Sequence, residues 1–165
     1  MITIRKATID DVPLIQEIAY QTWPDTYKNI VSEIQLEYML ELFYNQQTLI
    51  ETIAKKNHQF LLAFDQEICQ GFAAIEHQYL GNETTRLNKL YVLPEAQGKG
   101  IGKLLIEEVI VLAKERHSKS INLNVNRFNN AHFFYSKMGF CILKEVDIEL
   151  DFGYLMEDYI MEKYM

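Results

Sequence analysis

From Tyr91 to Lys103 the chain reads YVLPEAQGKGIGK, which is an apolar strand end, a turn at Pro94 and a glycine-rich loop. A helix is expected directly after the loop, because apolar residues recur there at helical spacing, at Ile101, Leu104, Leu105, Val109 and Leu112. The start of a helix presents unpaired backbone N–H groups and the positive end of the helix dipole. Glycines in front of it let an anion approach the backbone closely. The stretch therefore predicts a strand, a phosphate-binding loop and a helix, in that order.

Three kinds of phosphate-binding loop fit this outline, and their glycine spacing separates them. A Rossmann fingerprint that begins at Gly98 needs a glycine five residues later, where the chain has a lysine. A Walker A loop that ends just after Gly102 needs glycine at 97 and serine or threonine at 104, where the chain has glutamine and leucine. The remaining pattern, Gln97-x-x-Gly100-x-Gly102, resembles the pyrophosphate loop of the GNAT acetyltransferases. For this short pattern alone, a glycine-rich turn that caps an ordinary helix stays open as an alternative.

A second pattern, NNAHFFYSKMGF, runs from Asn129 to Phe140. It predicts a short helix, since asparagine suits the N-cap and Gly139 suits the left-handed position after the last turn. Alone it is typical of a core helix with an aromatic stripe. It also resembles the GNAT segment N-x-x-A-x-x-F-Y-x-K-x-G-F, with Phe128 where the first asparagine usually stands. Because both patterns occur in the family's order and separation, the chain is identified as a member of the GNAT superfamily, with the resemblance beginning at residues 4–7.

Length and composition are consistent with one globular domain over residues 1–165 with a single core. Two cysteines, Cys69 and Cys141, lie in apolar strand-like runs and are expected to be buried free thiols. No apolar run has the length of a membrane span and no signal-peptide pattern is present, so a cytoplasmic protein without membrane contact is expected. The net charge of −7 argues against nucleic acid as the main partner. The four histidines lack ligand spacing, so no metal is expected.

Hydrophobic patterns predict strands at about 2–6, 59–64, 68–78, 84–93, 121–126, 141–150 and 155–163. Helices are expected from Asp10 or Asp11 to about Trp23-Pro24, from Ser32 onward with Gln35 completing a capping box, and over about 46–56. This order predicts an α/β domain. The resemblance implies a single-domain GNAT fold, with a mixed, mostly antiparallel sheet of about six to seven strands and about four flanking helices. It also implies a V-shaped splay between residues 84–92 and 121–126 that holds the cofactor.

The resemblance implies that acetyl-CoA is the cosubstrate. Its pyrophosphate is expected on the glycine-rich loop and its pantetheine arm along the end of the preceding strand. The expected cofactor-binding residues are Leu90, Tyr91, Val92, Gln97, Gly98, Lys99, Gly100, Ile101, Gly102, Lys103, Asn129, Phe134, Tyr135 and Lys137.

Tyr135 matches the general acid of the family, which stabilises the departing thiolate; a buried packing tyrosine is the alternative. Many relatives carry a glutamate on the strand before the loop, but Asn88 stands there and cannot act as a base. Glu76 on the preceding strand is the expected substitute, with a solvated strand carboxylate as the alternative. Trp23 and Tyr27 resemble substrate-lining aromatics, with helix-end packing as the alternative. Together with Glu76 and Asn88 they form the expected acceptor site.

The resemblance implies an enzyme that acetylates a primary amine, and over the whole chain it is strongest to bacterial spermine/spermidine-type acetyltransferases. A small cationic amine such as a polyamine is expected, because an acidic protein attracts cations. Glu33, Glu37 and Glu41 form an acidic helical stripe that suits successive ammonium groups, with a solvated helix face as the alternative. A protein N-terminal acetyltransferase and a non-catalytic acyl-CoA sensor stay open, as does a homodimer.

Overall fold

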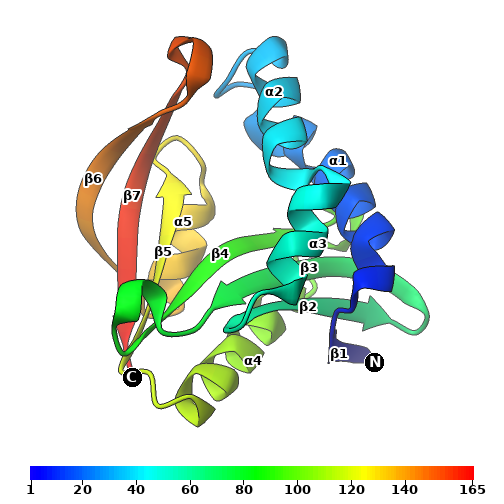
Figure 1. The fold of residues 1–165 in the computed structure, drawn as a ribbon, viewed down its shortest axis with the longest axis vertical. Coiled ribbons are helices and arrows are strands. Elements are labelled where there is room, and N and C mark those ends of the chain that lie inside the picture. The colour runs from blue at the N-terminus through cyan, green and yellow to red at the C-terminus, as the bar shows by residue number, and fades with distance from the viewer.

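The computed structural model describes all 165 residues (Figure 1). The strands are β1 (Ile2–Lys6), β2 (His58–Asp65), β3 (Ile68–Glu76), β4 (Thr84–Val92), β5 (Ser120–Asn126), β6 (Cys141–Glu149) and β7 (Leu155–Tyr164). They form one seven-stranded sheet in the order β1-β2-β3-β4-β5-β7-β6. Only β4 and β5 pair in parallel. The predicted mixed, mostly antiparallel sheet is therefore confirmed.

Helices cover both faces of this sheet. They are α1 (Val12–Tyr27), α2 (Glu33–Tyr44), α3 (Gln46–Ala54), α4 (Ile101–Glu115) and α5 (Ala131–Lys137). In Figure 1, α1, α2 and α3 lie on one side of the sheet and α4 lies on the other. One continuous hydrophobic core runs through these layers, with Trp23 from α1, Phe72 from β3 and Leu105 from α4 among its members. None of the helices combines the length and apolar composition needed to cross a lipid bilayer.

The parallel pair β4–β5 splays apart, as predicted. The two strands pair only from Thr84 to Leu87 on β4, and the remainder of β4, up to Val92, has no partner on that side. The separation begins at Asn88, where β4 carries one residue more than β3 and forms a β-bulge. Since a bulge bends its strand and increases its twist, the end of β4 turns away from β5 at this point. The opening lies directly before the glycine-rich loop.

Two helices differ from their predictions. Helix α1 continues through Pro24 to Tyr27, because its last turn is anchored by Trp23 and Tyr27, whose buried rings pack with centroids 4.8 Å apart. This packing outweighs the hydrogen bond that proline removes. Helix α4 buries a neighbouring stripe that contains Ile106 and Ala113, while Leu104 is 38% exposed.

Two side chains of α2 form hydrogen bonds with the β6–β7 hairpin. Ser32 caps the helix by accepting a hydrogen bond from the Gln35 N–H at 3.1 Å, as predicted. The Gln35 side chain does not complete the capping box, because it donates instead to the Leu155 carbonyl at 3.2 Å. One turn later, the Tyr38 hydroxyl donates to Asp151 Oδ2 at 2.8 Å. Helix α2 and the tip of the hairpin are therefore joined.

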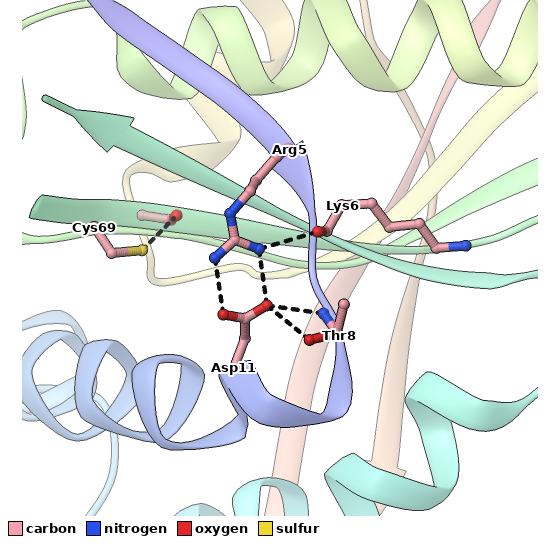
Figure 2. A network of polar contacts seen from close by, with 6 residues as sticks. Arg5, Lys6, Thr8, Asp11 and Cys69 are labelled. Atoms are coloured by element: carbon pink, nitrogen blue, oxygen red, sulfur yellow. Dashed lines mark hydrogen bonds and ion pairs between the residues drawn. The ribbon is translucent and has the colours of Figure 1, made fainter. Parts of the chain in front are cut away.

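The first strand is tied to the first helix by a forked ion pair. Arg5 Nη1 and Nη2 donate to the two carboxylate oxygens of Asp11 at 2.8 and 2.9 Å, and the Thr8 N–H donates to Asp11 Oδ2 (Figure 2). The Arg5 hydrogen bonds lower the pKa of Asp11 to about 2. Nearby, the Cys69 thiol is buried as predicted. The prediction for Cys141 is wrong: it is exposed, because β6 is an edge strand with little packed against it.

Candidate active site

Two cavities open at the splay between β4 and β5. The larger, about 750 Å³, lies beside the glycine-rich loop, and we call it the loop cavity. The smaller, about 340 Å³, is lined mostly by apolar and aromatic side chains of α1, α2, β4, β5 and the β6–β7 hairpin, and we call it the aromatic cavity. The residues that line both cavities are Leu90, Tyr91, Asn129, Ala131 and Tyr135. The two spaces therefore meet at the end of β4 and the start of α5.

The loop cavity is lined by backbone that is free to bind an anion. None of the amides from Gly98 to Lys103 donates a hydrogen bond within the protein. Gly98 and Gly100 have positive φ of 80° and 81°, and no atom lies within 4 Å of where a Cβ would stand. Gly102 lies against the Phe134 ring, where a Cβ would make an ordinary contact at 3.4 Å. The loop thus offers a row of donors at the start of α4, which suits a pyrophosphate.

The expected cofactor residues are mostly brought together in this cavity. Its lining includes Leu90, Tyr91, Val92, Gln97, Gly98, Gly100, Ile101, Gly102, Lys103, Asn129, Phe134 and Tyr135. The Gln97 side chain makes a hydrogen bond within the protein. Its amide donates to the Val92 carbonyl at 3.2 Å, which fixes the loop to the strand. Lys99 and Lys137 are exposed and line neither cavity.

Asn129 lies at the entry to α5 and orders the start of that helix. Its side-chain oxygen accepts a hydrogen bond from the Ala131 N–H at 2.9 Å. The predicted N-cap is displaced by one residue, because the residue directly before the helix is Asn130. Asn129 lines both cavities, so its amide nitrogen stays available at their junction.

Tyr135 lies at this junction and is held there by aromatic packing. Its ring makes edge contacts with Phe134 and Phe140, at centroid distances of 5.3 and 5.8 Å. Burial raises the pKa of Tyr135, and the neighbouring Tyr27 adds to the effect. The phenol is therefore protonated at neutral pH. A buried, protonated hydroxyl between two cavities is a potential proton donor to a group bound in either of them.

The aromatic cavity is framed by rings from α1, α2 and β4. Trp23 packs against Tyr27, Tyr44 and Tyr91, with ring centroids 4.8, 5.5 and 5.7 Å away. The hydroxyls of Tyr27 and Tyr91 are hydrogen-bonded to each other at 3.1 Å. Trp23 and Tyr27 thus belong to the core, as the packing interpretation expected, and they also line the cavity.

Three charged side chains line the aromatic cavity, and none of them was expected from the sequence. Burial lowers the pKa of Lys89 to about 8, and its ammonium group lies 5.4 Å from the centre of the Tyr44 ring. Arg86 donates to the side-chain oxygens of Asn122 and Asn124 on β5. Asp158 on β7 is buried. The sequence did contain one indication of these charged residues. Three asparagines alternate with apolar residues in β5, and such a polar strand face needs charged or polar neighbours.

Glu76 does not lie where the sequence placed it. It lines neither cavity, and its carboxylate is 3.6 Å from His58 Nε2. Glu76 pairs with Arg86 of β4 on one side and with His58 of β2 on its other side, and its carboxylate lies beside that histidine. Asn88 does line the aromatic cavity, at the bulge. The acidic stripe Glu33, Glu37 and Glu41 is exposed and lines neither cavity.

Comparison with known proteins agrees with this geometry. The family model described as "Acetyltransferase (GNAT) domain" matches residues 27–149. This chain belongs to the GNAT acetyltransferases. A spermidine N(1)-acetyltransferase from Thermoplasma acidophilum is 33% identical over 167 residues, which cover 98% of this chain and 96% of the relative. A [ribosomal protein bS18]-alanine N-acetyltransferase from Haemophilus influenzae is 39% identical over 82 residues, 50% of this chain and 52% of that relative.

Solved structures extend the comparison to the whole GNAT fold. The crystal structure of the PaiA N-acetyltransferase from Thermoplasma acidophilum, in complex with coenzyme A, has a TM-score of 0.85 and 30% identity. The match covers 100% of this chain and 99% of that one. The GNAT enzyme described here is thus an acetyl-CoA-dependent N-acetyltransferase, and the free amides of its loop cavity fit the pyrophosphate of coenzyme A.

Proposed function

We propose that this GNAT enzyme acetylates a primary amine of a small cationic molecule, with a polyamine as the first candidate. The observation that carries the proposal is the meeting of the loop cavity and the aromatic cavity at Tyr135. A donor bound on one side and an amine on the other would face each other there. The spermidine-acetylating relative, the net charge of −7 and the aromatic lining support a cationic acceptor.

In this proposal, the amides from Gly98 to Lys103 hold the pyrophosphate, and the unpaired edge of β4 at Leu90 and Val92 binds the pantetheine arm. Acetyl-CoA supplies the acetyl group as a thioester. Tyr135 donates a hydrogen bond to the departing sulfur. A phenol pKa near 10 lies above a thiol pKa near 8.5, so full transfer is uphill by about 2 kcal/mol. Burial increases this gap, and Tyr135 therefore acts chiefly by hydrogen bonding to the sulfur.

The amine must lose its proton before it attacks. For a free amine with a pKa near 10.4 this costs about 4.6 kcal/mol at pH 7, at about 1.4 kcal/mol for each pH unit. Burial in the aromatic cavity reduces the cost, because the amine of Lys89 in the same cavity has its pKa lowered to about 8. Desolvation thus does part of the work expected of Glu76, which lies outside the cavity. Solvent at the cavity mouth takes this first proton. The neutral nitrogen then forms its bond to the acetyl carbon as the carbon–sulfur bond breaks, and the second proton on the nitrogen passes to the departing sulfur, which leaves the amide and the free thiol of coenzyme A.

A protein N-terminus is a second candidate acceptor. The ribosomal-protein relative supports it, as does the presence of Lys89 and Arg86 in the aromatic cavity. Both cations suit the carbonyl groups that follow the α-amine of a peptide. That α-amine has a pKa near 8 and is easier to deprotonate.

Release of coenzyme A tests the proposal, measured with spermidine, spermine, an alanine-initiated peptide and no amine. We expect the polyamines to give the highest kcat/KM, with amide formation confirmed by mass spectrometry. A preference for the peptide would select the second candidate. Tight binding of acetyl-CoA without turnover of any amine would instead indicate a sensor module.

A further inference from the structure

The aromatic cavity contains a single carboxylate, that of Asp158. The residue is 2% exposed and belongs to β7, where its partner across the sheet is Asn126 of β5. Directly paired residues in antiparallel strands project to the same face of the sheet. The carboxylate therefore shares the face of Asn124 and Asn126, which both line the cavity.

Two consecutive hydrogen bonds, from Arg86 to Asn124 and from Asn124 to Asp158, fix the orientation of this carboxylate. Arg86 Nη2 donates to the side-chain oxygen of Asn124, so the Asn124 nitrogen is turned toward Asp158. That nitrogen donates to Asp158 Oδ2 at 3.3 Å. No protein group donates to Asp158 Oδ1, and no lysine, arginine or histidine forms an ion pair with either oxygen. One face of the carboxylate is thus positioned by the protein and the other is free.

Asp158 is the one anionic group among three charged side chains that line the cavity, and neither Arg86 nor Lys89 forms an ion pair with it. Burial raises the pKa of Asp158, and this is opposed by the Asn124 hydrogen bond and by the charges of Arg86 and Arg127. From α1, the phenol of Tyr27 faces the same region, and its pKa is raised by burial and further by Asp158. A buried carboxylate without an ionic partner is costly. A ligand ammonium group would supply the missing partner.

Other atoms in the cavity also lack partners. The side-chain polar atoms that are buried without a hydrogen bond are Trp23 Nε1, Tyr44 Oη and Arg86 Nε, and all three residues line this cavity. Buried polar groups in native proteins are nearly always satisfied. Of the three, Arg86 is the one linked to Asp158, through the side chain of Asn124.

We propose that Asp158 Oδ1 binds an ammonium group of the acceptor other than the amine that reacts, with Asn124 as the residue that positions the carboxylate. The inference rests on the proposed function, because it assumes that the acceptor is an amine. It assigns the recognition of positive charge to β7 inside the aromatic cavity and not to the exposed acidic stripe of α2.

Calorimetry on the protein saturated with coenzyme A tests this assignment, with spermidine as the probe. Asp158→Asn keeps the shape of the side chain and removes its charge. We expect Asp158→Asn to raise the Kd and the KM for spermidine about 10- to 100-fold, because the variant loses a hydrogen bond between two charged groups. The KM for acetyl-CoA should not change. Glu157→Gln is the matched control, because Glu157 neighbours Asp158 in β7 but lines neither cavity.

The outcomes separate this inference from the proposed function. An unchanged spermidine Kd and KM in a folded Asp158→Asn protein would overturn the role of Asp158 while leaving the acetyltransferase intact. If wild type releases no coenzyme A with any amine, the proposed function fails, and the Kd comparison still decides the role of Asp158. Absence of spermidine binding to wild type overturns both. Asp158→Ser provides a second neutral variant if the asparagine variant does not fold.

Discussion

At the scale of single residues, Tyr135 has a position fixed by its ring and a chemical role assigned to its hydroxyl. Replacing it with phenylalanine keeps the contacts with Phe134 and Phe140 and removes only the proton donor. We expect Tyr135→Phe to lower kcat by about 100-fold, the usual scale for loss of a general acid. The melting temperature should change little. Single-turnover rates measure the effect, with the exposed Tyr164→Phe as the control; equal rates for both variants would assign Tyr135 to packing alone.

His77 makes the stability of the protein depend on pH. The ring is buried and hydrogen-bonded to Thr85 and Gln59, and burial, together with the charge of Arg116, lowers its pKa to about 4. Since the folded-state pKa lies below the unfolded value near 6.5, this contribution is complete above pH 6.5 and is lost as the pH falls toward 4. Wild type should lose about 3 kcal/mol of unfolding free energy over that range, at about 1.4 kcal/mol for each unit.

Urea denaturation at several pH values measures this loss. His77→Gln should be less stable than wild type at pH 7.5 but should lose much less on acidification. The exposed His117→Asn is the control, because asparagine tolerates the left-handed backbone at that position. If His77→Gln and wild type show parallel pH dependence, the acid sensitivity arises elsewhere.

Sequence reasoning identified residues that lie in local motifs and missed those whose position depends on strand pairing. Tyr135 and Gly100 lie in continuous patterns, and both line the cavities as expected. Asp158 comes near the charged groups of β4 only because β7 inserts between β5 and β6 in the sheet. Glu76 was misplaced for a related reason, since its contact with His58 depends on the pairing of β2 with β3.

At the scale of elements, we propose that the glycine-rich loop and α4 act as one anion-binding unit. Gly100→Ala places a side chain in the left-handed region and beside the free amides. The backbone strain should cost about 1–2 kcal/mol of stability. Gly81→Ala is a matched control, because Gly81 also has a positive φ, of 76°, and open space around it, but lines neither cavity.

We expect both variants to lose similar stability and only Gly100→Ala to bind coenzyme A more weakly, by calorimetry. Equal affinity in the two variants would mean that the loop amides do not hold the pyrophosphate. The periodicity of α4 predicted this helix and its start, while the side that it buries depends on how the sheet twists beneath it.

At the scale of the whole molecule, the net charge of −7 creates a field that attracts cations toward the protein. The kcat/KM for spermidine should therefore fall several-fold as ionic strength rises from about 0.05 to about 0.5 M, because salt screens the field. A monoamine should show a weaker dependence, since it carries less charge. Parallel salt dependence for the two amines, measured at saturating acetyl-CoA, would show that long-range attraction does not select the acceptor.

The β6–β7 hairpin has a consequence for the range of acceptors. It supplies one side of the aromatic cavity through Ile148, Leu150, Leu155 and Met156, yet β6 is exposed along nearly its whole length. The opposite side rests on the central sheet and its packed helices. The cavity thus has one wall backed by the core and one wall that is held at its tip by α2 and is otherwise exposed, and a segment with few buried contacts moves at low energetic cost. We expect longer amines to be accommodated by displacement of the exposed wall, while the wall backed by the core keeps the junction at Tyr135 unchanged.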